Sequence, residues 1–169
     1  MINRLRRAYL CATLLAALAP LGAIASPLQD LAGHSRQLGD YAGKGKWLVV
    51  MLWASDCHVC NVEAHQYVDY HNRHHSGNVS VLGVSMDGVA HKAEALAFIR
   101  AHAVTFPNLI GEPEDVADLY TNLTGHPWVG TPTFLIYDPT GKLRAQQVGA
   151  IPADLIDAYI AQNGAAASH

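Results

Sequence analysis

Charged residues are scarce in this 169-residue sequence, and beyond its N-terminus no stretch is strongly basic. Only 15% of the residues are charged, and three of the 11 basic ones, Arg4, Arg6 and Arg7, lie near the N-terminus. Without these three, eight basic residues stand against 14 acidic ones, a net charge of −6. Binding to nucleic acid or to anionic lipid surfaces depends on clustered positive charge. The composition therefore argues against both kinds of partner.

The apolar run near the N-terminus is too short to cross a bilayer, which takes about 20 residues. It spans residues 8–19, only 12 positions, and directly follows the three arginines. Residues 23–25, Ala-Ile-Ala, then supply the small side chains of an A-x-A cleavage site. We predict a cleaved signal peptide at residues 1–25 and export to the periplasm, with no membrane span after cleavage. An uncleaved membrane anchor is the alternative that the sequence leaves open.

Cysteine is also rare, because the chain has only three and Cys11 lies inside the predicted signal peptide. The other two, Cys57 and Cys60, have the spacing C-x-x-C. A disulfide between them would close too small a loop to stabilise a fold strongly, since this effect grows with loop length. A zinc site would need two further ligands at metal spacing, and no other cysteine is left to supply them. The pair is better explained by thiol chemistry.

The order of apolar runs and turn residues predicts an α/β fold with a central mixed sheet and helices on both faces. The run at 47–53 does not alternate, which is typical of a strand covered on both sides. The expected strands are 47–53, 79–85, 106–110, 133–137 and 142–148, and the expected helices are 57–75, 89–103, 114–121 and 153–162. We divide the chain into a signal peptide at 1–25, an N-terminal lead at 26–35, one domain at 36–163 and a disordered tail at 164–169.

The C-x-x-C pair follows a predicted buried strand and begins a predicted helix, and this position has a chemical consequence. The free N–H groups and positive dipole end of a helix N-terminus favour the thiolate of Cys57. The thiolate is the nucleophile in thiol–disulfide exchange. Cys60, one turn further on, is close enough to attack the resulting mixed disulfide. The pattern thus predicts a redox-active pair in which Cys57 reacts first.

Residues 53–63, W-A-S-D-C-H-V-C-N-V-E, resemble the F-W-A-x-W-C-x-x-C-x-x-E signature of the thioredoxin superfamily. Residues 130–134, G-T-P-T-F, and 138–142, D-P-T-G-K, resemble later motifs of its exported TlpA/ResA-type thiol-disulfide oxidoreductases. The resemblance implies a thioredoxin-like domain with an αβ insertion before the Thr-Pro segment. It also implies that the bond before Pro132 is cis and that Pro132 faces the cysteine pair.

The resemblance suggests roles for individual residues. The catalytic set it implies is Cys57, Cys60, Glu63 and Pro132, and the substrate-docking set is Trp53, Asp56, His58, Val59 and Thr131. Glu63 lies three residues after Cys60, which on a helix puts both on one side, so that Glu63 could accept the Cys60 proton. A solvent-facing glutamate is the alternative. Asp56 departs from the family pattern, which has tryptophan before the first cysteine.

The family resemblance implies reduction of disulfides in exported client proteins by a monomer that a membrane thiol donor re-reduces. It implies no metal and no cofactor beyond the cysteine pair. His58 leaves the direction of electron flow open, because a protonated imidazole beside Cys57 would make the couple more oxidising. One alternative is therefore a disulfide-introducing oxidase. A second alternative is a Cu(I)-handling protein, in which the soft thiolates bind the metal together with His126. A peroxidase fits less well, since the first cysteine lacks a Thr/Pro-rich setting.

Overall fold

A computed structural model describes residues 28–164 of the chain. The predicted signal peptide, Cys11 and the tail beyond residue 164 lie outside the described residues. The strands are β1 (Leu28–Asp30), β2 (Ser35–Arg36), β3 (Trp47–Trp53), β4 (Val79–Ser85), β5 (Asn108–Gly111), β6 (Thr133–Tyr137) and β7 (Leu143–Val148). The α-helices are α1 (His58–His74), α2 (Lys92–Ala101), α3 (Pro113–Thr124) and α4 (Ala153–Gly164), and two 3-10 turns are Leu38–Asp40 and Val89–His91. No helix in this part of the chain is long and apolar enough to span a membrane.

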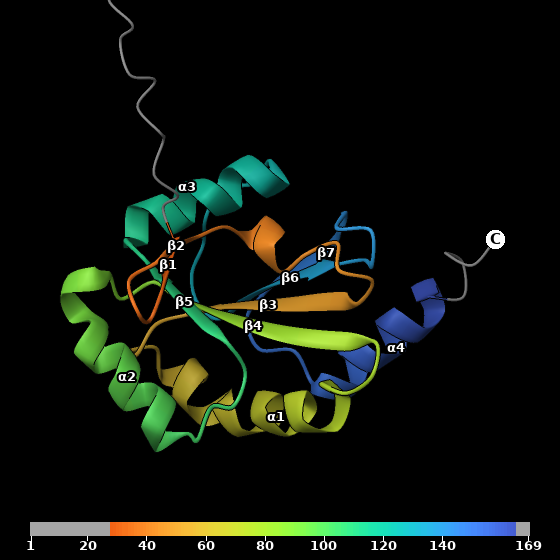
Figure 1. Ribbon diagram of the computed structural model, residues 1–169, viewed down its shortest axis with the longest axis horizontal. Coiled ribbons are helices and arrows are strands. Elements are labelled where there is room, and N and C mark those ends of the chain that lie inside the picture. Colours follow the sequence, from red (N-terminus) through yellow and green to blue (C-terminus); the bar gives the residue numbers. More distant parts are fainter. Residues whose placement is uncertain (1–27, 165–169) are drawn as a thin grey trace, which may run out of the picture.

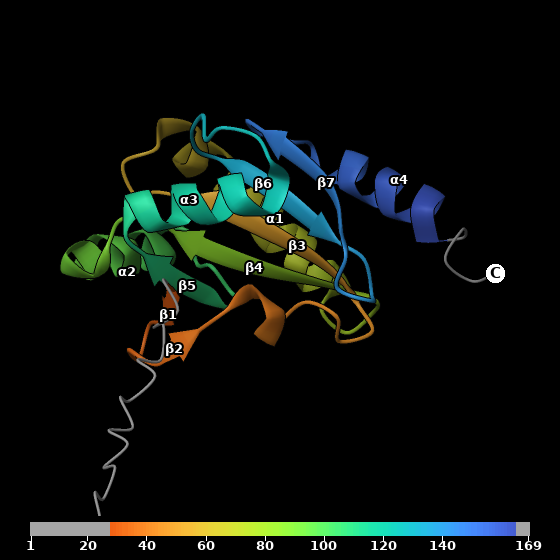
Figure 2. The same cartoon turned by 90° about the horizontal axis from the view of Figure 1, so that it is seen from above.

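The seven strands form one mixed sheet in the order β2-β1-β5-β4-β3-β6-β7. Strands β3 and β4 pair in parallel at its centre, and β6 joins β3 in antiparallel orientation. Helices α1, α2 and α4 lie on one side of the sheet and α3 on the other (Figures 1 and 2). The predicted fold class, a mixed sheet with helices on both faces, is confirmed.

The central position of β3 in the sheet explains why its sequence does not alternate between apolar and polar residues. All seven of its residues are buried, because both of its faces contribute to a core. Trp47, Val49, Met51 and Trp53 join the core beneath α1, α2 and α4, and Leu48, Val50 and Leu52 join the core beneath α3. A strand buried on both faces needs apolar side chains at every position.

The chain between β4 and Pro132 contains α2, β5 and α3, and the predicted αβ insertion falls within this stretch. Helix α3 begins at Pro113, one residue earlier than expected. Proline suits the first helical position, because its missing N–H would have no partner there and its φ angle is already helical. The proline therefore belongs to the helix that it was expected to precede.

The prediction that a lead at 26–35 lies outside the domain is wrong, because its described residues include a strand of the central sheet. Strand β1 pairs antiparallel with β5 and with β2, which extends the sheet by two strands. Leu28 is 1% exposed and packs in the core on the α3 side. Strands of three and two residues are too short to produce a recognisable alternation, so the sequence pattern did not indicate them.

Candidate active site

Cys57 and Cys60 form a disulfide bond at the beginning of α1, with their Cα atoms 5.2 Å apart. Cys57 is the N-cap residue of the helix, and its sulfur accepts a hydrogen bond from the Cys60 N–H at 3.0 Å. Cys57 is half-buried, whereas Cys60 is 0% exposed. Negative charge is favoured at a helix N-terminus, where the first N–H groups lack partners within the helix. The geometry therefore places the Cys57 sulfur where a thiolate is both stabilised and accessible.

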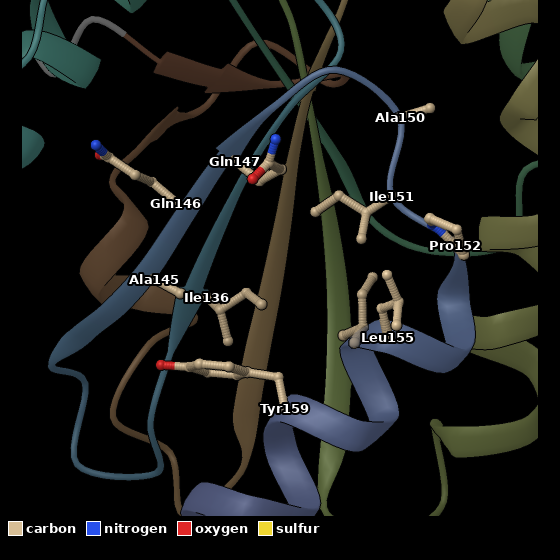
Figure 3. Close-up of a pocket in the computed structure, with 10 residues that line it drawn as sticks. Ile136, Ala145, Gln146, Gln147, Ala150, Ile151, Pro152, Leu155 and Tyr159 are labelled. Carbon is tan, nitrogen blue, oxygen red and sulfur yellow. The ribbon is translucent and has the colours of Figure 1, made fainter.

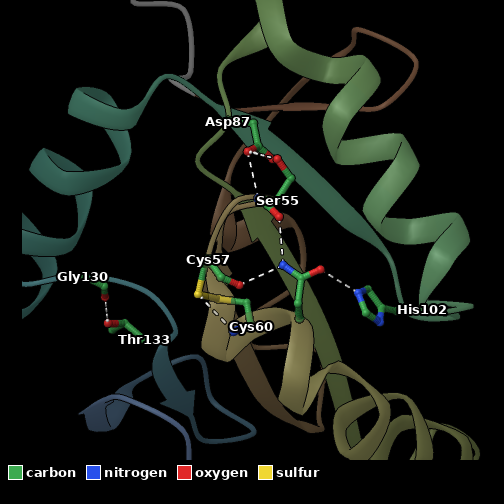
Figure 4. The surroundings of a disulfide bond; sticks show 8 residues. Ser55, Cys57, Cys60, Asp87, His102, Gly130 and Thr133 are labelled. Atoms are coloured by element: carbon green, nitrogen blue, oxygen red, sulfur yellow. Dashed lines mark hydrogen bonds between the residues drawn. A yellow bond between two sulfur atoms is a disulfide. The ribbon is translucent and has the colours of Figure 1, made fainter.

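Three side chains from separate parts of the chain hold the loop before Cys57 in place (Figure 4). Asp87, just after β4, accepts hydrogen bonds from the Ser55 N–H at 2.9 Å and the Ser55 hydroxyl at 2.8 Å. Asn61 on α1 donates to the carbonyl oxygens of Ser55 and Cys57, both at 2.9 Å. His102, which follows α2, contacts the Asn61 side-chain oxygen through Nε2 at 2.9 Å.

The sequence did not indicate that these three residues, Asp87, Asn61 and His102, hold the loop. Asn61 directly follows Cys60, so a polar side chain in the first helical turn was the one available signal. His102 lies 41 positions away from Asn61, and Asp87 lies 32 positions away from Ser55. A hydrogen bond between residues so far apart leaves no periodic pattern in the sequence.

The Thr131–Pro132 peptide bond is cis. Strand β6 begins at the next residue, Thr133, which lies opposite Leu52 on the antiparallel neighbour β3. The start of β6 and the end of β3 therefore share one end of the sheet, and Cys57 follows β3 at that same end. Pro132 is buried and Thr131 is half-buried. The fold thus brings the Thr-Pro segment to the cysteine end of the sheet.

Glu63 is half-buried on α1, one turn after Cys60. The side-chain amide of Gln66 donates to its carboxylate and accepts from the N–H of Ala153 at 3.2 Å, which ties Glu63 to the start of α4. Burial, together with the charge of Glu63, raises the pKa of Tyr67 to about 12. Glu63 is therefore not the fully solvent-facing residue of the alternative interpretation, and its part in proton transfer stays a prediction.

Three of the residues predicted to dock substrate form exposed surface around the pair. Asp56 and His58 flank Cys57 and are exposed, and Val59 is 42% exposed. Val129, just before the Thr-Pro segment, is 71% exposed. The surface around Cys57 thus mixes a carboxylate and an imidazole with apolar side chains, and its role in docking stays a prediction.

Trp53 was predicted to dock substrate, and the structure contradicts this. Its side chain is 1% exposed, stacks on Phe98 with ring centroids 4.2 Å apart, and donates from Nε1 to Asn108 at 3.0 Å. A side chain buried in this way cannot contact a partner at the surface. Trp53 instead supports the cysteine loop from the core.

A separate, mainly apolar groove lies between the edge strand β7 and helix α4 (Figure 3). Its lining residues are Ile136, Ala145, Gln146, Gln147, Ala150, Ile151, Pro152, Leu155, Ile156 and Tyr159. None of them belongs to the cysteine loop or to the Thr-Pro segment. The groove is therefore distinct from the candidate active site.

Metal-ligating side chains do not gather elsewhere in the described part of the chain. Among residues 28–164, no group of three or more His, Cys, Asp or Glu side chains could hold a metal ion. His126, on which the copper-handling alternative depends, is exposed just after α3. That alternative therefore depends on the two cysteines as its soft ligands.

Comparison with known proteins agrees with this geometry. The AhpC/TSA family model matches residues 22–146. The chain is 28% identical over 125 residues to the thiol-disulfide oxidoreductase ResA of Oceanobacillus iheyensis, covering 73% of this chain and 59% of that protein. It is 26% identical over 134 residues to ResA of Geobacillus kaustophilus, covering 79% of this chain and 71% of that protein.

The fold also matches solved structures. StoA from Bacillus subtilis superimposes with a TM-score of 0.60 at 20% identity, covering 80% of this chain and 98% of StoA. At that identity the match concerns the fold alone. The family match spans well over half of the chain. The cysteine pair lies at the start of a helix, at the end of the sheet to which the fold also brings the cis Thr131–Pro132 bond. The chain therefore belongs to the AhpC/TSA family and is a TlpA/ResA-type member of the thioredoxin superfamily.

Proposed function

We propose that this protein is an exported thiol-disulfide oxidoreductase that reduces disulfide bonds in client proteins of the periplasm. One observation carries the proposal: Cys57 is half-buried and caps α1 with its sulfur, which accepts a hydrogen bond from the Cys60 N–H, while Cys60 is fully buried. This arrangement stabilises one accessible thiolate and keeps the second sulfur within reach. The names of the ResA relatives support the same chemistry.

The exchange requires two successive attacks by sulfur. The Cys57 thiolate attacks one sulfur of a client disulfide, the client bond breaks, and the other client sulfur leaves as a thiolate. Cys60 then gives up its proton, for which Glu63 is the proposed acceptor, and attacks the Cys57 sulfur. The Cys57–Cys60 disulfide forms and the second client thiolate leaves. Two electrons have then passed from the pair to the client, so a separate thiol donor must restore the reduced pair.

The surroundings of His58 support the reducing direction. Its imidazole is exposed, so water screens any charge that it carries and weakens its effect on Cys57. A more oxidising couple would need stronger stabilisation of the Cys57 thiolate. We therefore expect a reduction potential between about −270 and −180 mV, the range from thioredoxin to protein disulfide isomerase.

Client reduction tests the activity directly. The reduced protein should cleave the disulfides of a model client such as insulin, and the Cys57→Ser variant should be inactive. The Cys60→Ser variant should instead accumulate a mixed disulfide between Cys57 and the client, because the resolving sulfur is missing. Adducts through Cys60 in the Cys57→Ser variant would contradict the assigned order of attack.

Equilibration against glutathione buffers tests the direction. A potential in the expected range supports a reductase. A value near −120 mV, that of a strong disulfide-introducing oxidase, would overturn the reducing direction while leaving thiol–disulfide exchange intact. The His58→Ala variant should shift the equilibrium only slightly if water screens the imidazole as proposed.

A further inference from the structure

Asn61 and His102 form a hydrogen-bonded pair beside the cysteine loop, with Nε2 of His102 2.9 Å from the Asn61 side-chain oxygen (Figure 4). The two side chains come from different elements, the first turn of α1 and the residue after α2. Both are half-buried. The pair therefore joins the start of the active-site helix to the end of a helix that lies far from it in the sequence.

The hydrogen bonds determine how the Asn61 amide is oriented. A side-chain amide has one oxygen that only accepts and one NH₂ group that donates twice. The NH₂ group faces the carbonyl oxygens of Ser55 and Cys57, both at 2.9 Å, so the oxygen faces His102 and Nε2 is the donor. A flipped amide would place its oxygen against two carbonyl oxygens. The donor on His102 thus favours the one orientation that satisfies all these groups.

His102 is itself fixed by the core. Its ring packs on Phe98 with centroids 4.5 Å apart, and Phe98 stacks on the buried Trp53 at 4.2 Å. Its backbone N–H donates to the Phe98 carbonyl at 3.0 Å. A continuous set of contacts therefore runs from the core through His102 and Asn61 to the carbonyl of Cys57.

We propose that Asn61 is a positioning residue for the Cys57 thiolate and that His102 acts through it by orienting its amide. The two Asn61 hydrogen bonds fix the backbone on either side of Asp56, which keeps the Cys57 sulfur over the N-terminus of α1 and 3.0 Å from the Cys60 N–H. Loss of either side chain lets the loop move and weakens thiolate stabilisation. The reduced form then becomes less favourable and the couple more reducing. The inference rests on the proposed function only in taking Cys57 as the reacting thiol.

The test measures Cys57 directly, without any client. The rate of alkylation by iodoacetamide is followed against pH in a Cys60→Ser background, which keeps the N–H of residue 60. Asn61→Ala and His102→Ala should both slow alkylation at pH 6.5, by about three- to tenfold if the titration midpoint moves by half to one unit. The His102→Gln variant should approach the wild-type profile, because a glutamine amide can still donate to Asn61. His75→Ala, an exposed histidine at the end of α1, is the control and should have no effect.

The double variant provides the sharpest comparison. If His102 acts through Asn61, Asn61→Ala combined with His102→Ala should behave like Asn61→Ala alone. In the protein with both cysteines, the glutathione equilibrium of the single variants should shift toward the disulfide by a similar factor. An unchanged profile in His102→Ala, or effects that multiply in the double variant, would overturn the proposal. Because alkylation needs no client, a wild-type protein that fails to reduce insulin would refute the proposed function and leave this test intact.

Discussion

Glu63 and Cys60 lie on the same side of α1, three residues apart, and we expect Glu63 to accept the proton of Cys60. Cys60 is 0% exposed, so bulk water does not reach its sulfur. The half-buried Glu63 carboxylate accepts a hydrogen bond from Gln66, whose side chain also contacts the first residue of α4. A carboxylate that is already held in one position can accept a proton without first having to be ordered.

Replacing Glu63 by Gln should slow the exchange reaction at neutral pH by up to about 10²-fold, the lower end of the range for a positioned proton acceptor. The amide keeps the size of the side chain but cannot accept the Cys60 proton. Initial rates of client reduction across pH would measure the effect. Glu114→Gln, in the exposed first turn of α3, is the matched control. The same rate and pH profile in both variants would exclude Glu63 from the reaction.

At the scale of elements, strand β4 must approach the core side chains of its neighbours closely. A Cβ at Gly83 would lie 1.9 Å from the Asn108 side-chain oxygen and 2.9 Å from the Trp53 indole nitrogen. Asn108 cannot move freely, because it accepts from Trp53 at 3.0 Å and donates to the Phe106 carbonyl at 2.9 Å. Glycine is required here for space and not for an unusual backbone angle.

Gly83→Ala should therefore destabilise the protein by about 1–3 kcal/mol, the usual cost of an added group in a well-packed core. The denaturant midpoint of unfolding would measure the loss. Gly39→Ala is the control, since a Cβ there meets nothing within 4 Å and its backbone angle is ordinary. Equal midpoints in the two variants would show that the Trp53–Asn108 contact adapts easily.

The β1–β2 hairpin depends on one carboxylate. Asp30 accepts hydrogen bonds from the backbone N–H groups of Ala32 at 3.0 Å and His34 at 2.9 Å, and it pairs with Arg36 at 2.9 Å. The backbone hydrogen bond from His34, with smaller contributions from its side chain and charge, lowers the pKa of Asp30 to about 2. A carboxyl group with a lowered folded-state pKa stabilises the folded state above its unfolded pKa and loses this effect as the pH falls.

The hairpin should therefore loosen as the pH falls from about 4 toward 2, and Asp30→Asn should loosen it already at neutral pH. Amide hydrogen exchange over residues 28–36 would measure both effects. Asp118→Asn, an exposed residue on α3, is the control and should leave the exchange unchanged. A hairpin that is equally protected at pH 2.5 and pH 6 would contradict the role given to Asp30.

At the scale of the whole molecule, the proposed periplasmic function requires export. We expect the mature protein to begin near Ser26, because the short apolar run is followed by small residues suited to cleavage at positions 23–25. N-terminal sequencing of protein recovered from the periplasm would test this. Ala25→Phe, which removes a small residue of the predicted cleavage site, should retain the precursor. A chain that starts at Met1 in the membrane fraction would favour the uncleaved anchor.

Much of the fold and the central chemistry could be predicted from local patterns. Strands β3, β4 and β6 lie where continuous apolar runs predicted them, since strands in the middle of a covered sheet need apolar side chains on both faces. The cysteine pair was placed at a helix start because spacing and flanking pattern are both local. The short strands β1 and β2 were missed, because two or three residues carry no period.

The sequence by itself determined the strands of the sheet centre, the C-x-x-C pair at a helix N-terminus and the candidate proline. Only the tertiary structure decided that Trp53 is core, that Asp87 anchors Ser55, and that His102 reaches Asn61 across 41 positions. The reason is physical. Burial and periodicity leave a local mark on the sequence, whereas a hydrogen bond between distant residues depends on how the helices and strands pack together.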